Sequence, residues 1–391
     1  LREAHQRGVE IYGLTTGFGP HVRYCASQDI VEQGDGLIAH LGAGRGRLAD
    51  RRVVRSLMLV RAQAIAQGCS GIAPEACNAF LALIEQDVVP AVPEIGSVGA
   101  SGDLIPLAHV ARVLTGVGRC VEQDGSTRAA ADVLRERGLE PIKLSGRDAL
   151  AIVNGTSFMT AYAALAVERA EQLIATAEKL TGWAFRMLGG RAQCLDERLH
   201  QARGHAGQIT SARCISEEAY AQGDFEDTTR PLQEVYSLRC APQILGAARD
   251  QIQAARAVIE REINGVNDNP VVWGEGEDAA VLHGGNFQGQ QIAFAADMIN
   301  AAITQTALLI ERQLDVLCNP ELNGDAPLLL AWQPGATSGL AGAQITATAI
   351  AAELRRSCQH SAVATMPTNG RNQDIVSMGT MAARVAYEQA P

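Results

Sequence analysis

The residues of this chain that could do chemistry include a glycine-rich run, Gly96 to His109, which passes into an apolar helical stretch. At its centre lies Ala100-Ser101-Gly102, followed by Asp103. Ser101 or Asp103 is suited to cap a helix that begins there, and Pro106 would fall in its first turn. The N–H groups at such a helix start can stabilise negative charge. By itself, a run of this kind is typical of an ordinary helix start.

Polar side chains that could bind a small molecule recur elsewhere in the chain. A glycine-rich turn runs from Tyr12 to Gly19, an Asn-Gly pair begins at Asn154, and Arg239 lies in the segment 236–243. An arginine can hold a carboxylate through two parallel hydrogen bonds, which a lysine does less well. Considered one at a time, these segments are ordinary turns and a surface charge.

Together and in this order, the segments resemble the aromatic amino acid ammonia-lyase and aminomutase family, which includes histidine ammonia-lyases. The resemblance extends over essentially all 391 residues and is closest to bacterial tyrosine ammonia-lyases. In that family an Ala-Ser-Gly triplet cyclises to 4-methylidene-imidazol-5-one (MIO), a built-in electrophile. The resemblance therefore implies an MIO group made from Ala100-Ser101-Gly102, with no metal or diffusible cofactor. The Gly102 nitrogen would attack the Ala100 carbonyl, an approach that a residue without a Cβ permits, and Asp103 would support the dehydrations.

The resemblance also implies a catalytic base. Eliminating ammonia from an α-amino acid removes a weakly acidic β-proton and expels a poor leaving group. An electrophile that adds the amine makes it a better leaving group, and a base must then take the β-proton. Tyr12 is expected to be that base. Because free tyrosine has a pKa of about 10, local charges would have to activate it.

Further residues receive binding roles from the same resemblance. Arg239 and Asn154 would hold the substrate carboxylate. Tyr236 would lie close to the electrophile, with Gln243 behind it, and Phe287 would pack on the electrophile. The remaining residues expected to line the substrate pocket are Gly19, Asn369, Asn372 and Gln373.

Two positions bear on the substrate. His40-Leu41 aligns with the segment that contacts the substrate ring, where the family has His-Leu for tyrosine, Phe-Leu for phenylalanine and Ser-His for histidine. A histidine can hydrogen-bond a buried phenol, whereas a phenylalanine leaves that hydroxyl unpaired at a cost of about 1–3 kcal/mol. Histidine ammonia-lyases carry a Glu at the position of Gln373, so a neutral Gln favours an uncharged aromatic substrate.

We therefore expect a carbon-nitrogen lyase that converts L-tyrosine to trans-p-coumarate and ammonia, with side activity on L-phenylalanine or L-DOPA. The first alternative is a tyrosine 2,3-aminomutase, which would re-add ammonia to give β-tyrosine with the same residues. A phenylalanine or histidine ammonia-lyase is a weaker alternative. A catalytically inactive, partner-binding relative is the non-enzymatic one, and the intact triplet argues against it.

The resemblance implies a homotetramer whose active sites are shared between subunits. Tyr12, His40, the triplet and Asn154 would come from one subunit. Tyr236 and Arg239 would come from a second, and Phe287 and Gln373 from a third. Family members continue past the position of Pro391, so we expect the C-terminal end of the family chain to be absent here.

The elements that must position these residues are mostly helices. Apolar residues at three- and four-residue spacing predict helices over 48–67, 74–88, 103–114, 161–188, 246–263, 290–318 and 341–356. The first of them has an arginine-rich outer face. Residues 117–125 indicate one short hairpin, and the polar stretch 204–231 is expected to be a long loop.

These long apolar helices must pack on one another, which predicts a mainly α fold. We expect a bundle of long helices with a glycine-rich, loop-rich N-terminal part that carries the MIO segment. The expected domains are an MIO-bearing domain over 1–145 and a long-helix domain over 146–391.

Composition excludes several classes of function. The net charge of −10 and the 4% share of aromatic residues argue against nucleic acid or an anionic membrane as the main partner.

The nine cysteines are widely spaced and the eight histidines show no metal-ligand spacing, so we expect free thiols and no metal site. The uncharged stretches 149–167 and 326–352 are broken by polar residues, proline or glycine, and neither is expected to span a membrane. We expect a cytoplasmic protein.

Overall fold

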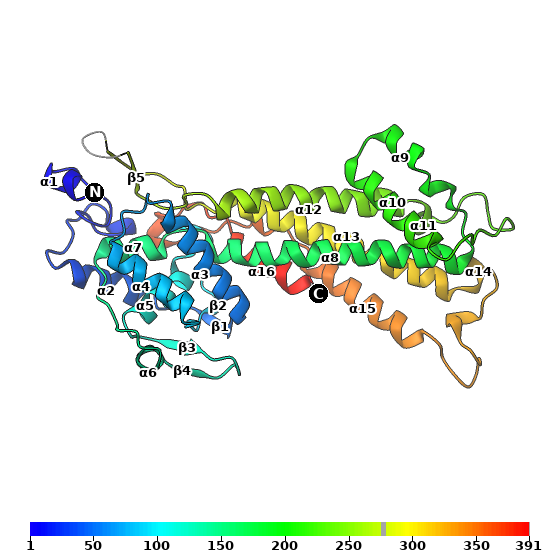
Figure 1. The fold of residues 1–391 in the computed structure, drawn as a ribbon, viewed down its shortest axis with the longest axis horizontal. Coiled ribbons are helices and arrows are strands. Elements are labelled where there is room, and N and C mark those ends of the chain that lie inside the picture. The colour runs from blue at the N-terminus through cyan, green and yellow to red at the C-terminus, as the bar shows by residue number, and fades with distance from the viewer. Residues whose placement is uncertain (275–278, 391) are drawn as a thin grey trace. The chain divides into compact units, whose positions relative to one another are not determined.

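The computed structural model describes residues 1–274 and 279–390 and is mainly helical, which confirms the predicted fold class (Figure 1). The chain divides into two compact units. The first unit comprises residues 1–165, 258–294 and 360–384; the second comprises 166–257, 295–359 and the residues from 385 onward. Each unit thus draws on three separate stretches of chain. The predicted boundary between domains at residue 145 stays a prediction.

The first unit contains short helices and three two-stranded antiparallel sheets. Its helices are α1 (Arg2–Gln6), α2 (Ile30–His40), α3 (Arg51–Ala66), α4 (Pro74–Glu85), α5 (Leu104–Leu114), α6 (Ala130–Glu136) and α7 (Gly146–Val153). Its strand pairs are β1 (Arg45–Leu48) with β2 (Pro93–Ile95), β3 (Arg119–Val121) with β4 (Thr127–Ala129), and β5 (Val271–Trp273) with β6 (Ala280–Leu282). The pair β3–β4 confirms the predicted hairpin.

Helix α7 lies at the centre of the first unit. Seven of its eight residues are buried, and it packs against both α2 and α5. A capping box begins the helix: the Ser145 side chain accepts a hydrogen bond from the Asp148 amide, and the Asp148 carboxylate accepts one from the Ser145 amide. The helix ends at Asn154, which places this residue at the edge of the site described below.

The remaining helices are mostly longer, and four of them pass from residues of one unit into residues of the other. They are α8 (Ser157–Leu188), α9 (Glu197–Arg203), α10 (Ala206–Tyr220), α11 (Tyr236–Arg239), α12 (Ala241–Ile263), α13 (Gln290–Cys318), α14 (Pro320–Asn323), α15 (Ala341–Ser357) and α16 (Gly379–Gln389). Short 3-10 helices are η1 (Gly19–His21), η2 (Ala192–Leu195), η4 (Leu328–Leu330), η5 (Ser361–Val363) and η6 (Asn369–Arg371).

Within the second unit, α8, α12 and α13 run side by side (Figure 1). Phe185, Leu245 and Leu309 from these helices belong to one buried apolar cluster. All seven predicted helices are present, and most of their ends are displaced by a few residues. Helix α13 is long and apolar enough to cross a membrane, but 67% of its apolar window is buried inside the structure, as is typical of a core helix.

The predicted long loop over 204–231 is wrong for about half of its length, because α10 occupies 206–220. The buried face of α10 includes Gly207, Gln208 and Ser211 beside Ile215. Small and polar residues on the buried face weaken the apolar periodicity from which a helix is recognised. Tertiary packing against the apolar cluster, which includes Ile215, supplies the stabilisation that this pattern hides.

Candidate active site

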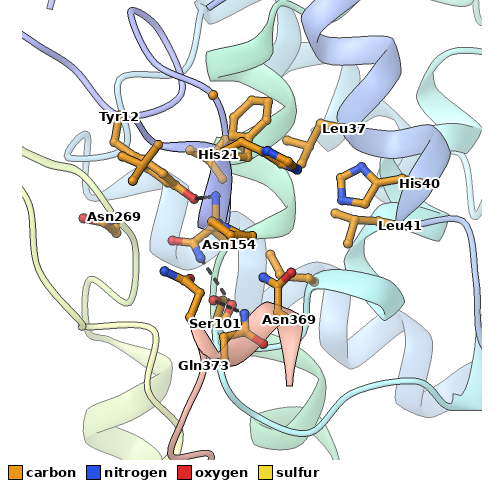
Figure 2. Close-up of a pocket in the computed structure, with 18 of the residues that line it drawn as sticks. Tyr12, His21, Leu37, His40, Leu41, Ser101, Asn154, Asn269, Asn369 and Gln373 are labelled. Carbon is orange, nitrogen blue, oxygen red and sulfur yellow. Dashed lines mark hydrogen bonds between the residues drawn. The ribbon is translucent and has the colours of Figure 1, made fainter. Parts of the chain in front are cut away.

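One cavity in the first unit, with a volume of about 1230 Å³, gathers most of the predicted site residues (Figure 2). Its wall is formed by the loop that begins at Tyr12, the end of α2, the segment before α5, the end of α7, and the segments around 283–287 and 368–373. The predicted residues that line it are Tyr12, Gly19, His40, Leu41, Ala100, Ser101, Gly102, Asn154, Phe287, Asn369, Asn372 and Gln373.

The loop that carries Tyr12 is held at both the backbone and the side chain of this residue. The Tyr12 amide donates to His283 Nε2 at 3.1 Å, and the Gly19 amide donates to the phenol oxygen at 2.7 Å (Figure 2). Gly19 has a φ of +55°, a backbone conformation that glycine adopts without strain. The phenol of Tyr12 is thereby fixed at the cavity wall.

Opposing influences act on the pKa of Tyr12. Burial raises the pKa, because the phenolate loses hydration. The hydrogen bond from the Gly19 amide and the positive charge of Arg147 both lower it, and burial prevails in this structure. The net result is a pKa of Tyr12 above its ordinary value, so this structure does not activate Tyr12 as a base.

The Ala100-Ser101-Gly102 segment forms a bend between β2 and α5. Gly102 has a φ of +66°, and a Cβ at this position would collide with the Gly155 carbonyl. That same carbonyl accepts a hydrogen bond of 2.7 Å from the Asp103 amide. Only glycine fits at position 102 without moving the neighbouring backbone.

Asp103 is fully buried behind the bend and does not line the cavity. One carboxylate oxygen accepts from the hydroxyls of Ser97 (2.7 Å) and Thr380 (2.5 Å); the other accepts from the amides of Phe158 (2.8 Å) and Met159 (2.9 Å). Burial raises the pKa of Asp103, and these four donors act against the rise. Asp103 thereby ties the bend to α8 and α16.

Ser101 is contacted from two sides. The Asn154 side-chain amide donates to the Ser101 carbonyl at 3.2 Å, and the Gln373 amide donates to the Ser101 hydroxyl at 2.8 Å (Figure 2). The Asn154 side-chain oxygen is buried and accepts no hydrogen bond from the described residues. This oxygen is free to accept from an amine placed in the cavity.

His40 stands at the C-terminal end of α2, beside Leu41. Its Nδ1 lies 2.9 Å from the Gly36 carbonyl, which can only accept, so Nδ1 carries the proton in this contact. In the neutral ring, Nε2 is then left as an acceptor. Such an acceptor is suited to a phenol O–H.

Besides Asp103, three predicted site residues do not line this cavity. Tyr236, Arg239 and Gln243 belong to the second unit, where the Arg239 guanidinium lies 4.6 Å from the centre of the Tyr236 ring. Tyr236 is 69% exposed. Arg239 Nε and Gln243 Oε1 are buried without a hydrogen-bond partner among the described residues, and both side chains line a separate cavity of about 650 Å³ in that unit.

The cavity wall also contains residues to which sequence reasoning gave no role. They include His21, Leu37, Asn269 and His283. Asn269 lies in an Asn-Asp-Asn-Pro run, and His283 lies four residues before Phe287, which is predicted to line the pocket. His21 ends the short 3-10 helix η1, which has no periodic pattern, so its sequence offers no such signal.

Comparison with known proteins identifies the family of the chain. A family model for aromatic amino acid lyases matches residues 1–390. The chain is 41% identical to a tyrosine ammonia-lyase of Cupriavidus metallidurans, over 97% of this chain and 74% of that protein. It is 38% identical to a histidine ammonia-lyase of Treponema denticola, over 97% of this chain and 75% of that protein.

A solved structure shows the same fold. The crystal structure of a tyrosine aminomutase from Streptomyces globisporus superposes with a TM-score of 0.91 at 35% sequence identity, covering 100% of this chain and 77% of that one. Since the family model spans residues 1–390 and these relatives share the fold and more than a third of the residues, the chain belongs to the aromatic amino acid lyase family.

Proposed function

We propose that this protein is a tyrosine ammonia-lyase that converts L-tyrosine to trans-p-coumarate and ammonia. The observation that carries the proposal is that one cavity brings the Ala100-Ser101-Gly102 bend together with the Tyr12 phenol and the His40 ring. These are an electrophile precursor, a base and an acceptor for a phenol. The similar tyrosine ammonia-lyase of Cupriavidus metallidurans supports the same activity.

The bend fits the formation of an MIO group. The Gly102 nitrogen bonds to the Ala100 carbonyl carbon, and the carbonyl oxygen leaves as water with the amide hydrogens of Gly102 and Ser101. Ser101 loses its hydroxyl and its Cα hydrogen as a second water, which leaves a Cα=Cβ double bond. Neither step is an oxidation or a reduction. The bare Gly102, wedged against the Gly155 carbonyl, is the feature that fits this ring.

When formed, the group supplies an electrophilic methylidene that the substrate amine can add to, which makes the amine a better leaving group. Asn154 offers its unpaired oxygen to the substrate, and Gln373 orients the Ser101 side chain before the ring forms. Tyr12 takes the β-proton, with its phenol oxygen held by the Gly19 amide. His40 accepts the hydrogen of the substrate phenol at Nε2.

The substrate carboxylate requires a cation that the cavity does not supply. Among the described residues that line it, none is an arginine or a lysine. Arg239 has an unpaired Nε and belongs to the other unit. We therefore propose a homotetramer in which Arg239 and Tyr236 of a second subunit, and further residues of a third, complete each site.

The proposal is tested by incubating the protein separately with L-tyrosine, L-phenylalanine and L-histidine. Near-UV absorbance reports cinnamate-type products, and chiral chromatography of the same samples reports β-amino acids. The intact mass of the same preparation should be lower than that of the encoded chain by two water molecules. A Ser101→Ala variant, which cannot form the double bond, is the matched control and should make no product.

Coumarate from tyrosine, with little turnover of the other two amino acids, is the expected result. Accumulation of β-tyrosine would instead assign a tyrosine 2,3-aminomutase, a function that the similar Streptomyces globisporus structure makes the main alternative. Faster formation of cinnamate from phenylalanine would show that His40 does not select the substrate. A full-length mass without the loss of two waters would contradict the electrophile itself.

A further inference from the structure

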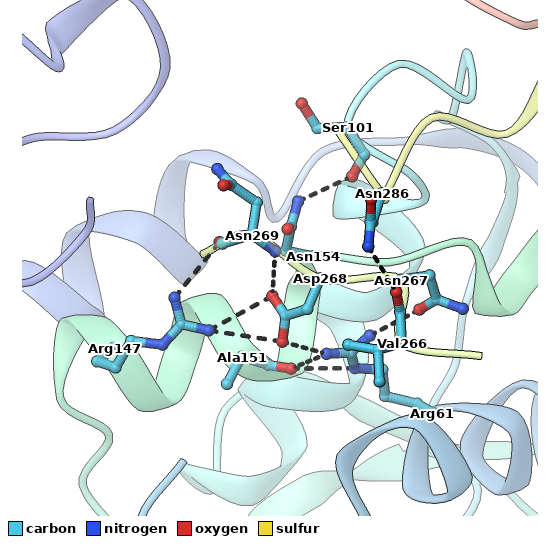
Figure 3. Close-up of polar contacts among 10 residues, drawn as sticks. All are labelled: Arg61, Ser101, Arg147, Ala151, Asn154, Val266, Asn267, Asp268, Asn269 and Asn286. Carbon is cyan, nitrogen blue, oxygen red and sulfur yellow. Dashed lines mark hydrogen bonds and ion pairs between the residues drawn. The ribbon is translucent and has the colours of Figure 1, made fainter. Parts of the chain in front are cut away.

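Beneath the Ala100-Ser101-Gly102 bend lies a cluster of three buried charges: Arg61 of α3, Arg147 of α7 and Asp268 (Figure 3). Arg61 Nη2 lies 3.0 Å from one Asp268 oxygen, and Arg147 Nη2 lies 3.4 Å from the other. The Arg61 side chain is 0% exposed and that of Asp268 is 2% exposed. Buried ion pairs of this kind contribute little net stability, because desolvation offsets their attraction. Stability alone therefore does not account for these three buried charges.

Arg61 holds the end of α7. Its Nε donates to the Ala151 carbonyl at 3.0 Å, and Nη2 donates to the same oxygen. The last carbonyls of a helix have no partner within the helix, and Arg61 supplies one here. Asn154 follows the last residue of α7, and its backbone amide donates to the Leu150 carbonyl. The guanidinium thus fixes the place where the chain leaves α7.

Arg61 also lies against the next residue, Gly155. A Cβ at Gly155 would collide with Arg61 Nη1 and would come within 2.6 Å of the Asn267 side-chain oxygen. Nη1 donates to that oxygen at 3.2 Å, so Arg61 and Asn267 form a packed floor under Gly155 (Figure 3). The other side of Gly155 faces the bend, because its carbonyl accepts from the Asp103 amide and blocks any side chain at Gly102.

Asp268 fixes the direction of the Arg61 guanidinium. Its side chain also accepts from the Asn269 amide at 2.7 Å, which anchors the carboxylate to its own loop. A continuous set of contacts therefore runs from Asp268 through Arg61 and Gly155 to Gly102. Cyclisation needs the Gly102 nitrogen held close to the Ala100 carbonyl, and holding reacting groups in place is a large source of rate.

We propose that Arg61 and Asp268 are positioning residues for the self-cyclisation of Ala100-Ser101-Gly102, with the Gly155 carbonyl as the wall that they hold in place. The inference rests on the proposed function, because it presupposes that the ring forms. The bonds made and broken are those given above for the loss of two waters. Neither residue takes part in them chemically.

The test compares three purified variants by intact mass, which reports cyclisation without any assay of turnover. Asp268→Asn keeps the shape of the side chain and removes the charge that orients Arg61. Arg61→Lys keeps the charge but leaves one nitrogen to serve the three acceptors. The control is Glu178→Gln in the second unit, where Glu178 is equally buried and pairs with Arg249 at 2.6 Å.

We expect wild type and Glu178→Gln to lose two waters completely. Asp268→Asn and Arg61→Lys should cyclise about 10-fold or more slowly, so that folded protein isolated early retains the unprocessed mass. Thermal unfolding of all three variants is measured alongside. A purely structural role predicts lower melting temperatures with complete cyclisation in every case.

Complete cyclisation of both Asp268→Asn and Arg61→Lys at the wild-type rate overturns the inference and leaves the proposed function intact. Absence of the two-water loss in wild type overturns both. If Asp268→Asn does not fold, Arg61→Lys decides the question, since it preserves charge balance in the cluster. An unprocessed mass in Glu178→Gln as well would show that any buried pair suffices, and this also overturns the inference.

Discussion

At the scale of single residues, His40 shows how a local hydrogen bond prepares a side chain for recognition. His40 Nδ1 donates a hydrogen bond to the Gly36 carbonyl, four residues earlier on the same helix. This bond selects the tautomer in which Nε2 is an acceptor. A phenol O–H placed against this nitrogen has a partner, whereas a bare phenyl ring would leave the nitrogen unpaired. Under the proposed function, the choice between tyrosine and phenylalanine rests on this one hydrogen bond.

We predict that His40→Phe reverses this choice. Loss of the acceptor should lower kcat/KM for tyrosine relative to phenylalanine by about 1–3 kcal/mol, roughly 5- to 150-fold. The ratio is measured from initial rates of coumarate and cinnamate formation. The mass loss of two waters serves as the control, because the hydrogen bond of the His40 ring goes to Gly36 and not to the bend. An unchanged ratio would show that another residue recognises the ring.

The acid–base behaviour of Tyr12 is the second prediction at this scale. A base must be deprotonated, so kcat/KM should rise with pH toward the pKa of Tyr12, which burial raises. Arg147 stabilises the phenolate, and Arg147→Met should raise that pKa further. The rising limb of the pH profile should therefore move to higher pH. Arg135→Gln, which removes an exposed arginine, should leave the limb in place.

Arg61 shows where residue types mislead. From the sequence it belongs to an arginine-rich outer face, but in the structure it is fully buried, so that prediction is wrong for this residue. Its partner Asp268 lies 207 residues away along the chain. Helical periodicity reports only local spacing, and a buried charge is recognised only when its distant counter-charge is known. In contrast, the segments around Tyr12, Ser101 and Asn154, which line the cavity, were predictable from their motifs.

At the scale of elements, α7 links the stability of the first unit to its chemistry. The helix is capped at Ser145, is buried over nearly its whole length, and ends at Asn154. The Asp148 carboxylate extends the cap, since it also accepts from the Ala73 amide at 2.8 Å. Removing the cap at the start of α7 should therefore lower the stability of the protein. The end of α7 holds Asn154, so changes there should affect the proposed function.

Ser145→Ala tests this division. Loss of the cap should destabilise the protein by about 0.5–2 kcal/mol, since the Asp148 amide loses its acceptor. Thermal unfolding should begin at a lower temperature, with kcat nearly unchanged. Ser357→Ala, on exposed α15, removes a hydroxyl that bonds only to a helix carbonyl and should change the melting temperature little. Equal melting temperatures for wild type and Ser145→Ala would show that the cap does not contribute.

Long helices were predictable because periodicity is strong over many turns, and α13 was predicted with both ends correct. Helix α10 was missed because its buried face is small and polar. The sequence also did not predict that each unit is formed by three separate stretches of the chain, since this depends on which distant helices pack together. The local spacing of apolar residues therefore predicts whether a segment is a helix or a strand. It does not predict which distant elements pack together.

At the scale of the whole molecule, the proposed shared site would supply the positive charge that the described lining of the large cavity lacks. The described lining of the large cavity contains His40, His21, His283 and Glu32 as its ionisable groups besides Tyr12 and Cys25, with no arginine or lysine. Arg239, the residue expected to bind the carboxylate, lies in the other unit. A carboxylate enclosed without a cation is costly, so binding requires that a cation be brought to it.

Mixing experiments test the shared site. Ser101→Ala lacks the electrophile and Arg239→Ala lacks the carboxylate partner, so each variant alone should be inactive. Co-expressed in one cell, they should form mixed assemblies in which some sites combine an intact Ser101 with an intact Arg239. Turnover well above that of either parent is expected. Activity no greater than the sum of the parents would show that each site is built from one chain.

The contacts of the bend also determine when, under the proposed function, the ring can first form. The Ser101 hydroxyl is held by Gln373, 272 residues later, and Asp103 by Thr380, 277 residues later. At about 5–20 residues per second, a ribosome needs on the order of tens of seconds to make that stretch. A nascent chain therefore carries the triplet long before it carries the residues that brace it. Under the proposed function, ring closure therefore follows the synthesis and packing of Gln373 and Thr380, which hold the bend in place.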